Sequence, residues 1–217
     1  MATNPVELPV PFPVRAKVFN LMNKQQITPA GSGFIQTITR GTPFWYAEYE
    51  TPPLADNRYN NMIAFLDSLD GSVGTFLAYD PRRPMPWAYR TSPLTATPWT
   101  QPGQTAPRVT AVDYANSIVS MDRLAVGAIL TKGDYFSVKV GNIWHLHRIV
   151  GNYTTVSTTQ ANIVVRPRPI FAATSLPAVR YVKACCEMKL SVPYEEDDDV
   201  DTFPILRFKG VQFRDRT

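Results

Sequence analysis

The chain has very few cysteines and no long apolar run. Only two of its 217 residues are cysteine, and these are neighbours, Cys185 and Cys186, between which a disulfide would be strained. No apolar run approaches the ~18 residues that a membrane-spanning helix needs. Residues 1–5 lack the basic and then apolar pattern of a secretory signal. We therefore expect a soluble protein with reduced cysteines and no insertion into a membrane.

Charged residues and histidines are also scarce, which limits the available chemistry. Charged residues make up 18% of the chain and apolar residues 44%, a balance typical of folded domains. The only histidines, His145 and His147, share one face of a predicted strand, but no third zinc ligand stands at a characteristic spacing, so we expect a solvent-facing pair. The sequence has no nucleophile elbow and no phosphate-binding glycine loop. It therefore predicts no metal, no cofactor and no catalytic centre.

Proline, by contrast, is abundant, and it restricts helix formation. Twenty prolines are about 9% of the chain against a usual ~5%, and proline is disfavoured inside helices and central strands. Only one segment, 55–70, has the helical spacing of apolar residues. Asp56 is suited to cap its first turn, and Gly71 follows its end. The apolar face of this predicted helix consists of Tyr59, Met62, Ile63, Leu66 and Leu69.

The rest of the chain alternates short apolar segments with turn residues, which predicts strands. The Gly141-Asn142 pair between two of them favours a tight hairpin, and segment 121–130 predicts a weak helical turn. We expect a mainly β fold, a β-sandwich or barrel-like domain with one amphipathic helix and a small inserted or appended β module. The predicted strands cover 16–22, 34–39, 44–50, 75–79, 87–91, 109–120, 135–140, 143–150, 161–166, 180–192 and 205–213.

A segment rich in proline and threonine divides these strands into two groups. Residues 93–107 have no periodicity, as is typical of a linker. We predict that 1–92 and 178–217 together form one β domain that holds the helix. Residues 108–177 would then form a small barrel-like module inserted into it.

The acidic residues are concentrated in one run. The net charge is +4, yet six of the eighteen acidic residues lie within 195–201, so the remaining 12 acids face 22 basic residues and the rest of the chain carries about +10. A solvated loop, a calcium site and an electrostatic docking loop for a neighbouring subunit are all compatible with such a run. The basic remainder fits nucleic acid, an anionic surface or an acidic protein equally well. The predicted docking loop contains Glu195, Glu196, Asp197, Asp198 and Asp199.

Aromatic and arginine residues suggest a surface for protein contact. Segment 44–50 has aromatic residues on both faces, which is typical of a strand covered by the core on one side and by a neighbouring subunit on the other, or of a strand buried in a two-layer domain. Segment 81–90 mixes arginine with aromatics, as single-strand nucleic-acid sites do, but its prolines favour a stiff arm that lies on another protein. The predicted subunit interface comprises Phe44, Trp45, Tyr49, Arg82, Arg83 and Trp87.

The order and spacing of several short motifs resemble a known family, the distal tail proteins of bacteriophages with siphovirus-like tails. The resemblance covers about half the chain in pieces, and none of its motifs is catalytic. It rests on Ser32-Gly33-Phe34-Ile35-Gln36, Arg40-Gly41, Trp45, Ala47, Pro52-Pro53-Leu54, Phe65-Leu66, Leu69, Gly71-Ser72-Val73-Gly74-Thr75-Phe76 and Asp80-Pro81, and in the second part on Lys132-Gly133-Asp134-Tyr135-Phe136, Arg148-Ile149-Val150 and Pro167-Arg168-Pro169.

This resemblance implies a structural virion protein that is assembled in the bacterial cytoplasm. Such proteins form an oligomeric ring, usually a hexamer, that joins the tail tube to the tail hub and the adsorption apparatus. The β domain with the helix would form the ring as a belt, and the smaller module would project outward, where a host surface glycan is a further candidate partner. The alternative is a carbohydrate-binding or carbohydrate-processing protein at the bacterial surface. Single-strand nucleic-acid binding is a third, weaker reading, and we expect no nucleic-acid partner.

Overall fold

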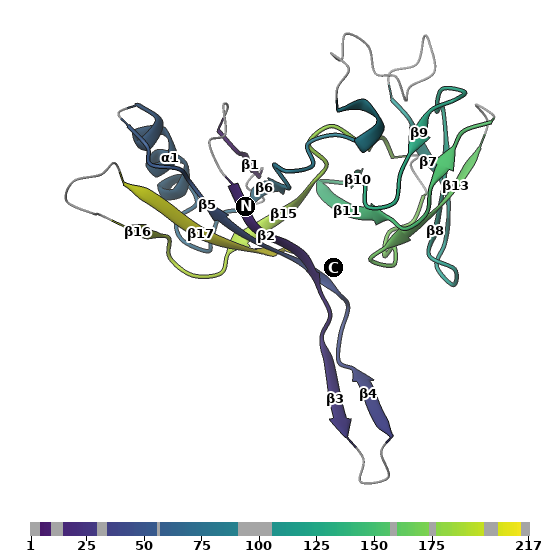
Figure 1. Ribbon diagram of the computed structural model, residues 1–217, viewed down its shortest axis with the longest axis horizontal. Helices are drawn as coiled ribbons and strands as arrows, with labels where there is room; N and C mark the ends of the chain where they lie inside the picture. The colour runs from purple at the N-terminus through teal and green to yellow at the C-terminus, as the bar shows by residue number, and fades with distance from the viewer. Residues whose placement is uncertain are drawn as a thin grey trace.

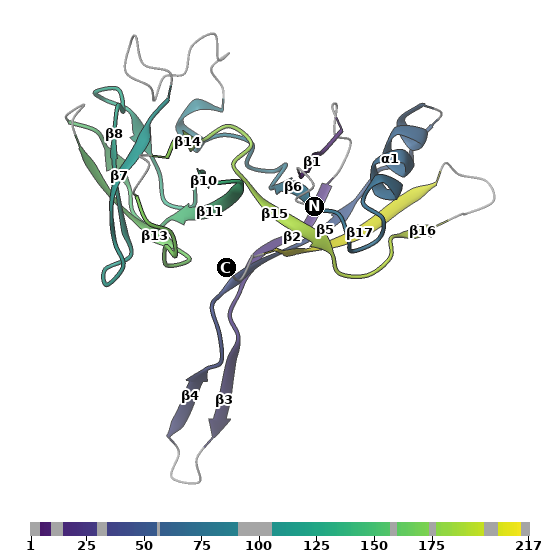
Figure 2. The same cartoon turned by 180° about the vertical axis from the view of Figure 1, so that it is seen from behind.

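The described part of the chain folds mainly into β-strands, with one α-helix, as predicted. The computed structural model describes residues 5–9, 15–29, 34–55, 57–90, 106–156, 160–173, 177–197 and 204–213. The described strands form one larger sheet, a smaller sheet and two separate two-stranded pairs. Figures 1 and 2 show the larger sheet and the helix at one end of the molecule, the smaller sheet at the other, and a thin arm that extends away from both.

The larger sheet combines strands from the beginning and the end of the chain. Its inner strands β15 and β17 come from the C-terminal part and pair with strands from the first 80 residues. The order across the sheet is β1 (Val6–Glu7), β6 (Phe76–Tyr79), β15 (Cys185–Leu190), β17 (Ile205–Gln212), β5 (Phe44–Glu50) and β2 (Arg15–Met22), with β16 (Glu195–Asp197) paired to β17.

The helix α1 (Asn57–Ser68) covers the apolar face of this sheet and is slightly shorter than the predicted 55–70. The ring of Phe65 packs edge-on against Phe76, with the ring centroids 5.9 Å apart. After the helix, Asp70 and Gly71 both have positive φ, and the Gly74 amide donates to the Leu69 carbonyl at 2.7 Å. The predicted role of Gly71 at the helix end therefore agrees with its conformation, whereas the predicted cap Asp56 lies outside the described residues.

The smaller sheet closes on itself as a barrel. The Val109 amide donates to the Pro177 carbonyl at 2.9 Å, and the Val179 amide donates to the Pro107 carbonyl at 2.8 Å, so the first strand meets the last. Its core contains Val119, Phe136, Val138 and Ile163, all fully buried. The order is β14 (Val179–Arg180), β10 (Tyr135–Val140), β11 (Ile143–Ile149), β13 (Ala161–Arg166), β8 (Ile118–Asp122) and β7 (Arg108–Asp113), with β9 (Ile129–Leu130) and β12 (Tyr153–Thr154) as a separate pair.

The barrel packs directly against the larger sheet. The buried Trp45 indole donates a hydrogen bond to the Leu146 carbonyl of β11 at 2.9 Å. The side chain of Tyr135 from β10 belongs to the core of the larger sheet. On β15, Glu187 is buried and accepts a 3.4 Å hydrogen bond from the Trp144 amide, and its burial raises the pKa of that carboxyl group. The two parts of the chain therefore share a packed junction.

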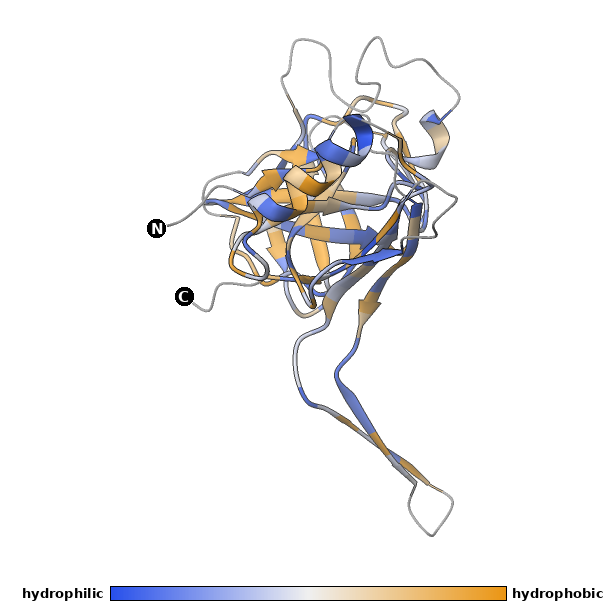
Figure 3. Ribbon diagram, turned by 90° about the vertical axis from the view of Figure 1, so that its left-hand side faces the viewer, coloured by the Kyte–Doolittle hydropathy of each residue, from blue (hydrophilic) through white to orange (hydrophobic). Residues whose placement is uncertain are grey.

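The arm is a two-stranded ribbon that continues from β2 and β5. It consists of β3 (Gln25–Pro29) and β4 (Ile35–Thr39), which pair with each other only. Every side chain described in these two strands is exposed. Figure 3 shows the ribbon extending from the body of the molecule.

Several sequence predictions of local structure are wrong. Segment 87–91 was predicted as a strand, but Trp87–Tyr89 form a short 3-10 helix (η1), in which the Tyr89 amide donates to the Pro86 carbonyl. No helical turn occurs in 121–130, where β8 ends and β9 begins and where Arg123 and Gly127 have positive φ. Strands predicted over 109–120 and 180–192 are each interrupted by turns.

Other predictions of local structure are confirmed or lie outside what the structure describes. The hairpin at Gly141-Asn142 is confirmed, since Val140 pairs with Ile143 and Gly141 has a φ of 59°. Strand β14 pairs with β10, so the smaller sheet extends beyond the predicted boundary at 177. The predicted linker 93–107 lies outside the described residues except for Ala106 and Pro107.

The close packing of β17 leads to a stability prediction. A Cβ atom on Gly210 would lie 2.9 Å from Cζ of Phe76 and 3.0 Å from Sδ of Met188, both fully buried. We expect Gly210→Ala to lower the free energy of unfolding by about 1–3 kcal/mol in urea titrations, because overpacking a dense core forces neighbours to move. Gly41→Ala is the control, since its Cβ would have 3.5 Å to the nearest atom. Equal unfolding midpoints for the two variants would contradict the packing described here.

Candidate functional site

A cleft of about 780 Å³ lies where the larger sheet meets the barrel. One wall comes from β2 and from the segment after β6, and the other from the turn between β9 and β10 and from β11. Its lining is rich in cations and contains two carboxylates, Asp80 and Asp134. The cationic lining residues are Arg82, Arg83, Arg90, Lys132 and Arg148.

Both carboxylates of the cleft are occupied by hydrogen bonds that build its walls. The buried Asp134 accepts from the Trp87 amide at 2.8 Å and from the Thr131 amide at 2.7 Å and hydroxyl at 2.8 Å. Asp80, also buried, accepts from Nε of Arg82 at 2.9 Å and from its amide at 3.0 Å. These bonds raise the pKa of Arg82. The two acids thus hold the backbone in position, and their oxygens are already occupied by donors of this chain.

The other cations of the cleft are held by neutral groups. Nη1 of Arg83 donates to the Gly133 carbonyl at 2.8 Å. The guanidinium of Arg90 lies 4.6 Å from the ring centroid of Trp87. Arg148 donates to the Tyr135 hydroxyl at 3.1 Å, and its Nε is buried without a hydrogen-bond partner among the described residues. Within the described residues, these three arginines and Lys132 form no ion pair with a carboxylate.

A second hollow of about 770 Å³ adjoins the first and shares Lys132, Gly133 and Arg148 with it. It extends along the barrel to the exposed Arg166 and Arg168 and reaches the base of the arm. No carboxylate is among the residues that line it. We call the two hollows together the basic cleft, with seven cations, Arg82, Arg83, Arg90, Lys132, Arg148, Arg166 and Arg168, and two carboxylates.

The acidic run begins as an ordered strand. Glu195–Asp197 form β16, so the prediction of a loop is wrong for these three residues, while Asp198 and Asp199 lie outside the described residues. All three side chains of β16 are exposed. A carboxylate oxygen of Asp197 lies 3.1 Å from Nη1 of Arg207. We call the three exposed acids of β16, Glu195, Glu196 and Asp197, the acidic edge.

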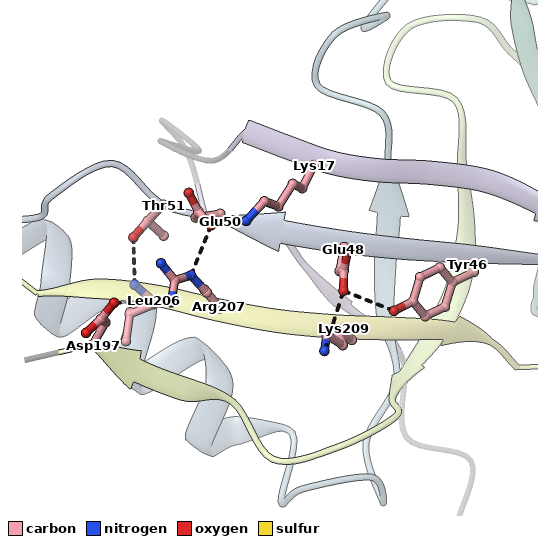
Figure 4. A network of polar contacts seen from close by, with 9 residues as sticks. All are labelled: Lys17, Tyr46, Glu48, Glu50, Thr51, Asp197, Leu206, Arg207 and Lys209. Atoms are coloured by element: carbon pink, nitrogen blue, oxygen red, sulfur yellow. Dashed lines mark hydrogen bonds and ion pairs between the residues drawn. The ribbon is translucent and has the colours of Figure 1, made fainter.

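On the strands next to the acidic edge, β17, β5 and β2, the basic and acidic side chains compensate one another (Figure 4). Glu50 accepts from Lys17 at 2.9 Å and from Nε of Arg207 at 3.0 Å. These hydrogen bonds lower the pKa of Glu50. Glu195 and Glu196 form no ion pair within the described residues, although Glu196 accepts a hydrogen bond from the Tyr59 hydroxyl. Their negative charge is therefore presented to solvent.

The structure divides the predicted interface residues into two sets. Trp45 and Tyr49 are 0% and 1% exposed, so the prediction that they contact a neighbouring subunit is corrected, because their side chains fill the core of this chain. Phe44 is half-buried, with Nζ of Lys24 5.4 Å from its ring centroid. Arg82, Arg83 and Trp87, by contrast, line the basic cleft together, and their role in an interface stays a prediction.

Sequence reasoning missed the residues of the opposite wall. Lys132, Asp134 and Arg148 come from the barrel and meet the arginines of 82–90 only through the fold. The one local signal was the Lys132-Gly133-Asp134 turn, in which Gly133 has a φ of 91°. Glycine is favoured where φ is positive, so this residue indicates a turn but does not reveal what the turn faces.

The histidines and cysteines do not form a reactive site. His147 is buried, contrary to the predicted solvent-facing pair, and its Nδ1 lies 3.0 Å from the Pro167 carbonyl. Both cysteines are buried, and burial raises the pKa of Cys185 to about 11. Within the described ranges, no three His, Cys, Asp or Glu side chains gather closely enough to hold a metal ion.

The one described α-helix is too short and too polar to cross a membrane.

The role of Asp134 in the cleft wall can be tested directly. We expect Asp134→Ala to lower the free energy of unfolding by about 1–3 kcal/mol, because it removes the acceptor of the part-buried amides of Trp87 and Thr131. Asp113→Ala is the control, since the exposed Asp113 also accepts two hydrogen bonds, from Asn116, but at a solvated turn. Urea unfolding of both variants measures the difference. A loss for Asp134→Ala no larger than for the control would show that the wall does not depend on this carboxylate.

Comparison with known proteins finds neither a family model nor a curated protein that matches this chain. The function is therefore argued from the charges, exposed side chains and packing of the chain itself.

Proposed function

We propose that this chain is a structural protein of a bacteriophage tail without enzymatic activity. In this proposal, copies of the chain form a closed ring, a hexamer, at the distal end of the tail. The ring connects the tail tube to the hub and to the host-adsorption apparatus. The observation that carries the proposal is the exposed apolar arm formed by β3 and β4.

The arm has the properties of a segment that becomes stable when it packs against a second protein surface. A two-stranded ribbon is at best marginally stable in water, and this one has no third strand or helix packed on it in the described residues. Ile27 and Ile35 lie on one face of the ribbon and are 64% and 69% exposed, and Ile38 on the other face is exposed as well. Because burying such side chains is favourable by about 1.5–3 kcal/mol each, a second protein surface would stabilise the arm.

A ring of identical subunits also needs two different complementary surfaces on each copy. In a cyclic head-to-tail assembly, one surface of each copy contacts a different surface of the next. The arm supplies one such surface, and the packed junction between barrel and sheet keeps the body rigid enough to present the other. These features support a ring component, and the buried, hydrogen-bonded carboxylates of the cleft support a role without catalysis.

We expect the apolar face of the arm to be required for assembly. Ile27→Glu combined with Ile35→Glu should weaken ring formation at least about tenfold, measured by light scattering and electron microscopy with and without the tail-tube protein, because the charges oppose burial. Gln26→Glu combined with Gln36→Glu adds the same charge to the opposite face and should have a much smaller effect. A wild-type chain that stays monomeric at high concentration with the tail-tube protein present would contradict the proposal.

A second candidate function, carbohydrate binding at the bacterial surface, is favoured by one observation. Trp87 is 65% exposed at the cleft, with Arg90 against its ring, and exposed aromatic rings stack on sugars. Hydrolysis is less well supported than binding, since Asp80 and Asp134 are both engaged by donors.

The carbohydrate candidate makes its own prediction. Trp87→Ala should reduce retention of the purified protein on host wall polysaccharide by at least about tenfold if the ring of Trp87 stacks on a sugar. Val126→Ala, which removes a side chain that is equally exposed on the barrel, is the control. Absence of retention for the wild-type protein would exclude this candidate and leave the structural role.

A further inference from the structure

We infer that the basic cleft of one copy binds the acidic edge of the next copy. This inference rests on the proposed ring and names a contact that would orient its subunits. It depends on three features of the described residues: the cations of the cleft, the exposed acids of β16, and the positions of the two surfaces in the chain.

The cleft has a strong excess of positive charge. Its seven cations and two carboxylates leave a formal charge of +5. Both carboxylates accept hydrogen bonds from donors of the cleft wall, and Arg82 is the only one of the seven cations that forms an ion pair within the described residues. The buried Nε of Arg148 has no partner in the described part of the chain. An acceptor brought in from outside would satisfy such a donor and offset the mutual repulsion of the cations.

The acidic edge has the complementary character. All three of its residues, Glu195, Glu196 and Asp197, are acidic. The described part of the run is an exposed strand, and Glu195 and Glu196 form no ion pair there. A strand held by β17 presents its carboxylates in a fixed order, which reduces the ordering cost of binding.

The positions of the two surfaces favour a contact between different copies. Figures 1 and 2 show β16 at the end of the larger sheet that is farthest from the barrel, whereas the barrel forms one wall of the cleft. The two surfaces therefore face different neighbours. A contact between two unlike surfaces of identical chains is head-to-tail, the kind that closes into a ring.

The charge pattern also distinguishes this occupant from other anions. A nucleic acid or a phosphate-bearing glycan would satisfy the cleft but would leave the acidic edge without a role. A second copy accounts for both surfaces with one contact. Because complementary charges mainly set encounter rate and orientation, we expect ring formation to slow as salt rises above ~0.1 M, where the screening length is ~10 Å.

Charge reversal tests the contact. The cleft variant carries Arg83→Glu and Lys132→Glu. The edge variant carries Glu195→Lys and Glu196→Lys. All four of these native side chains are exposed. Each variant alone should raise the protein concentration needed for half-maximal ring formation by at least about tenfold, because like charges would face each other. The matched control is Arg15→Glu with Arg58→Glu, which reverses two exposed cations outside the cleft and should assemble as the wild type does.

Restoration of assembly provides the decisive measurement. An equal mixture of the cleft and edge variants should form rings again, since in an alternating ring every reversed cleft meets a reversed edge and every native cleft a native edge. The chain that carries all four substitutions should also assemble. Circular dichroism and urea unfolding confirm that each variant is folded.

The outcomes separate this inference from the proposed function. If the wild type forms rings and both reversed variants form them equally well, the contact does not exist and the ring stands. If both variants fail and neither the mixture nor the fourfold variant assembles, the two surfaces do not meet and the inference is overturned. If the wild type forms no ring even with the tail-tube protein, the proposed function fails first. Single-stranded DNA or polyphosphate that binds the wild-type cleft and leaves ring formation unchanged would assign the cleft to another anion and overturn the inference.

Discussion

The position of the basic cleft depends on the buried Trp45. Its indole donates to the Leu146 carbonyl of the barrel at 2.9 Å, and its ring centroid lies 5.6 Å from that of Phe19 and 5.7 Å from that of Tyr135. The guanidinium of Arg148 lies 5.2 Å from the same ring. One side chain thus links β5, β2, β10 and β11 and supports a cation of the cleft. Because a buried indole must keep its hydrogen bond, the barrel cannot shift far without leaving a buried donor unsatisfied.

The distribution of charge follows from the same arrangement. The carboxylates near the junction are buried and serve as acceptors for backbone amides, as Asp134 does for Trp87 and Thr131. Three exposed acids, Glu195, Glu196 and Asp197, lie together at the other end of the larger sheet. The fold therefore separates a positive surface from a negative one, although the net charge of the chain is only +4. Such separation favours oriented association more than strong nonspecific binding.

The sequence was sufficient to predict features governed by local periodicity. Alternation along 44–50 predicts the strand β5, helical spacing predicts α1, and Gly141-Asn142 predicts the hairpin between β10 and β11. It failed where the outcome depends on distant segments. Aromatics on both faces of β5 suggested contact with another subunit, but the barrel and the helix cover one face, so Trp45 and Tyr49 belong to the core. The basic cleft was hidden for the same reason, since arginines from 82–90 meet Lys132 and Arg148 only in three dimensions.

The arm has a consequence for the solubility of the free chain. The fifteen residues 25–39 contain no charged side chain, and Lys24 and Arg40 stand at the two ends of this stretch. Exposed, uncharged strands with isoleucine are templates for self-association into fibrillar aggregates, and flanking cations act as gatekeepers against it. The two gatekeepers are joined where the Arg40 amide donates to the Lys24 carbonyl at 2.7 Å, so both charges lie at the root of the ribbon, and the strands β3 and β4 themselves carry none. In the proposed ring, burial of these strands against a neighbouring copy would therefore also protect the chain from precipitation.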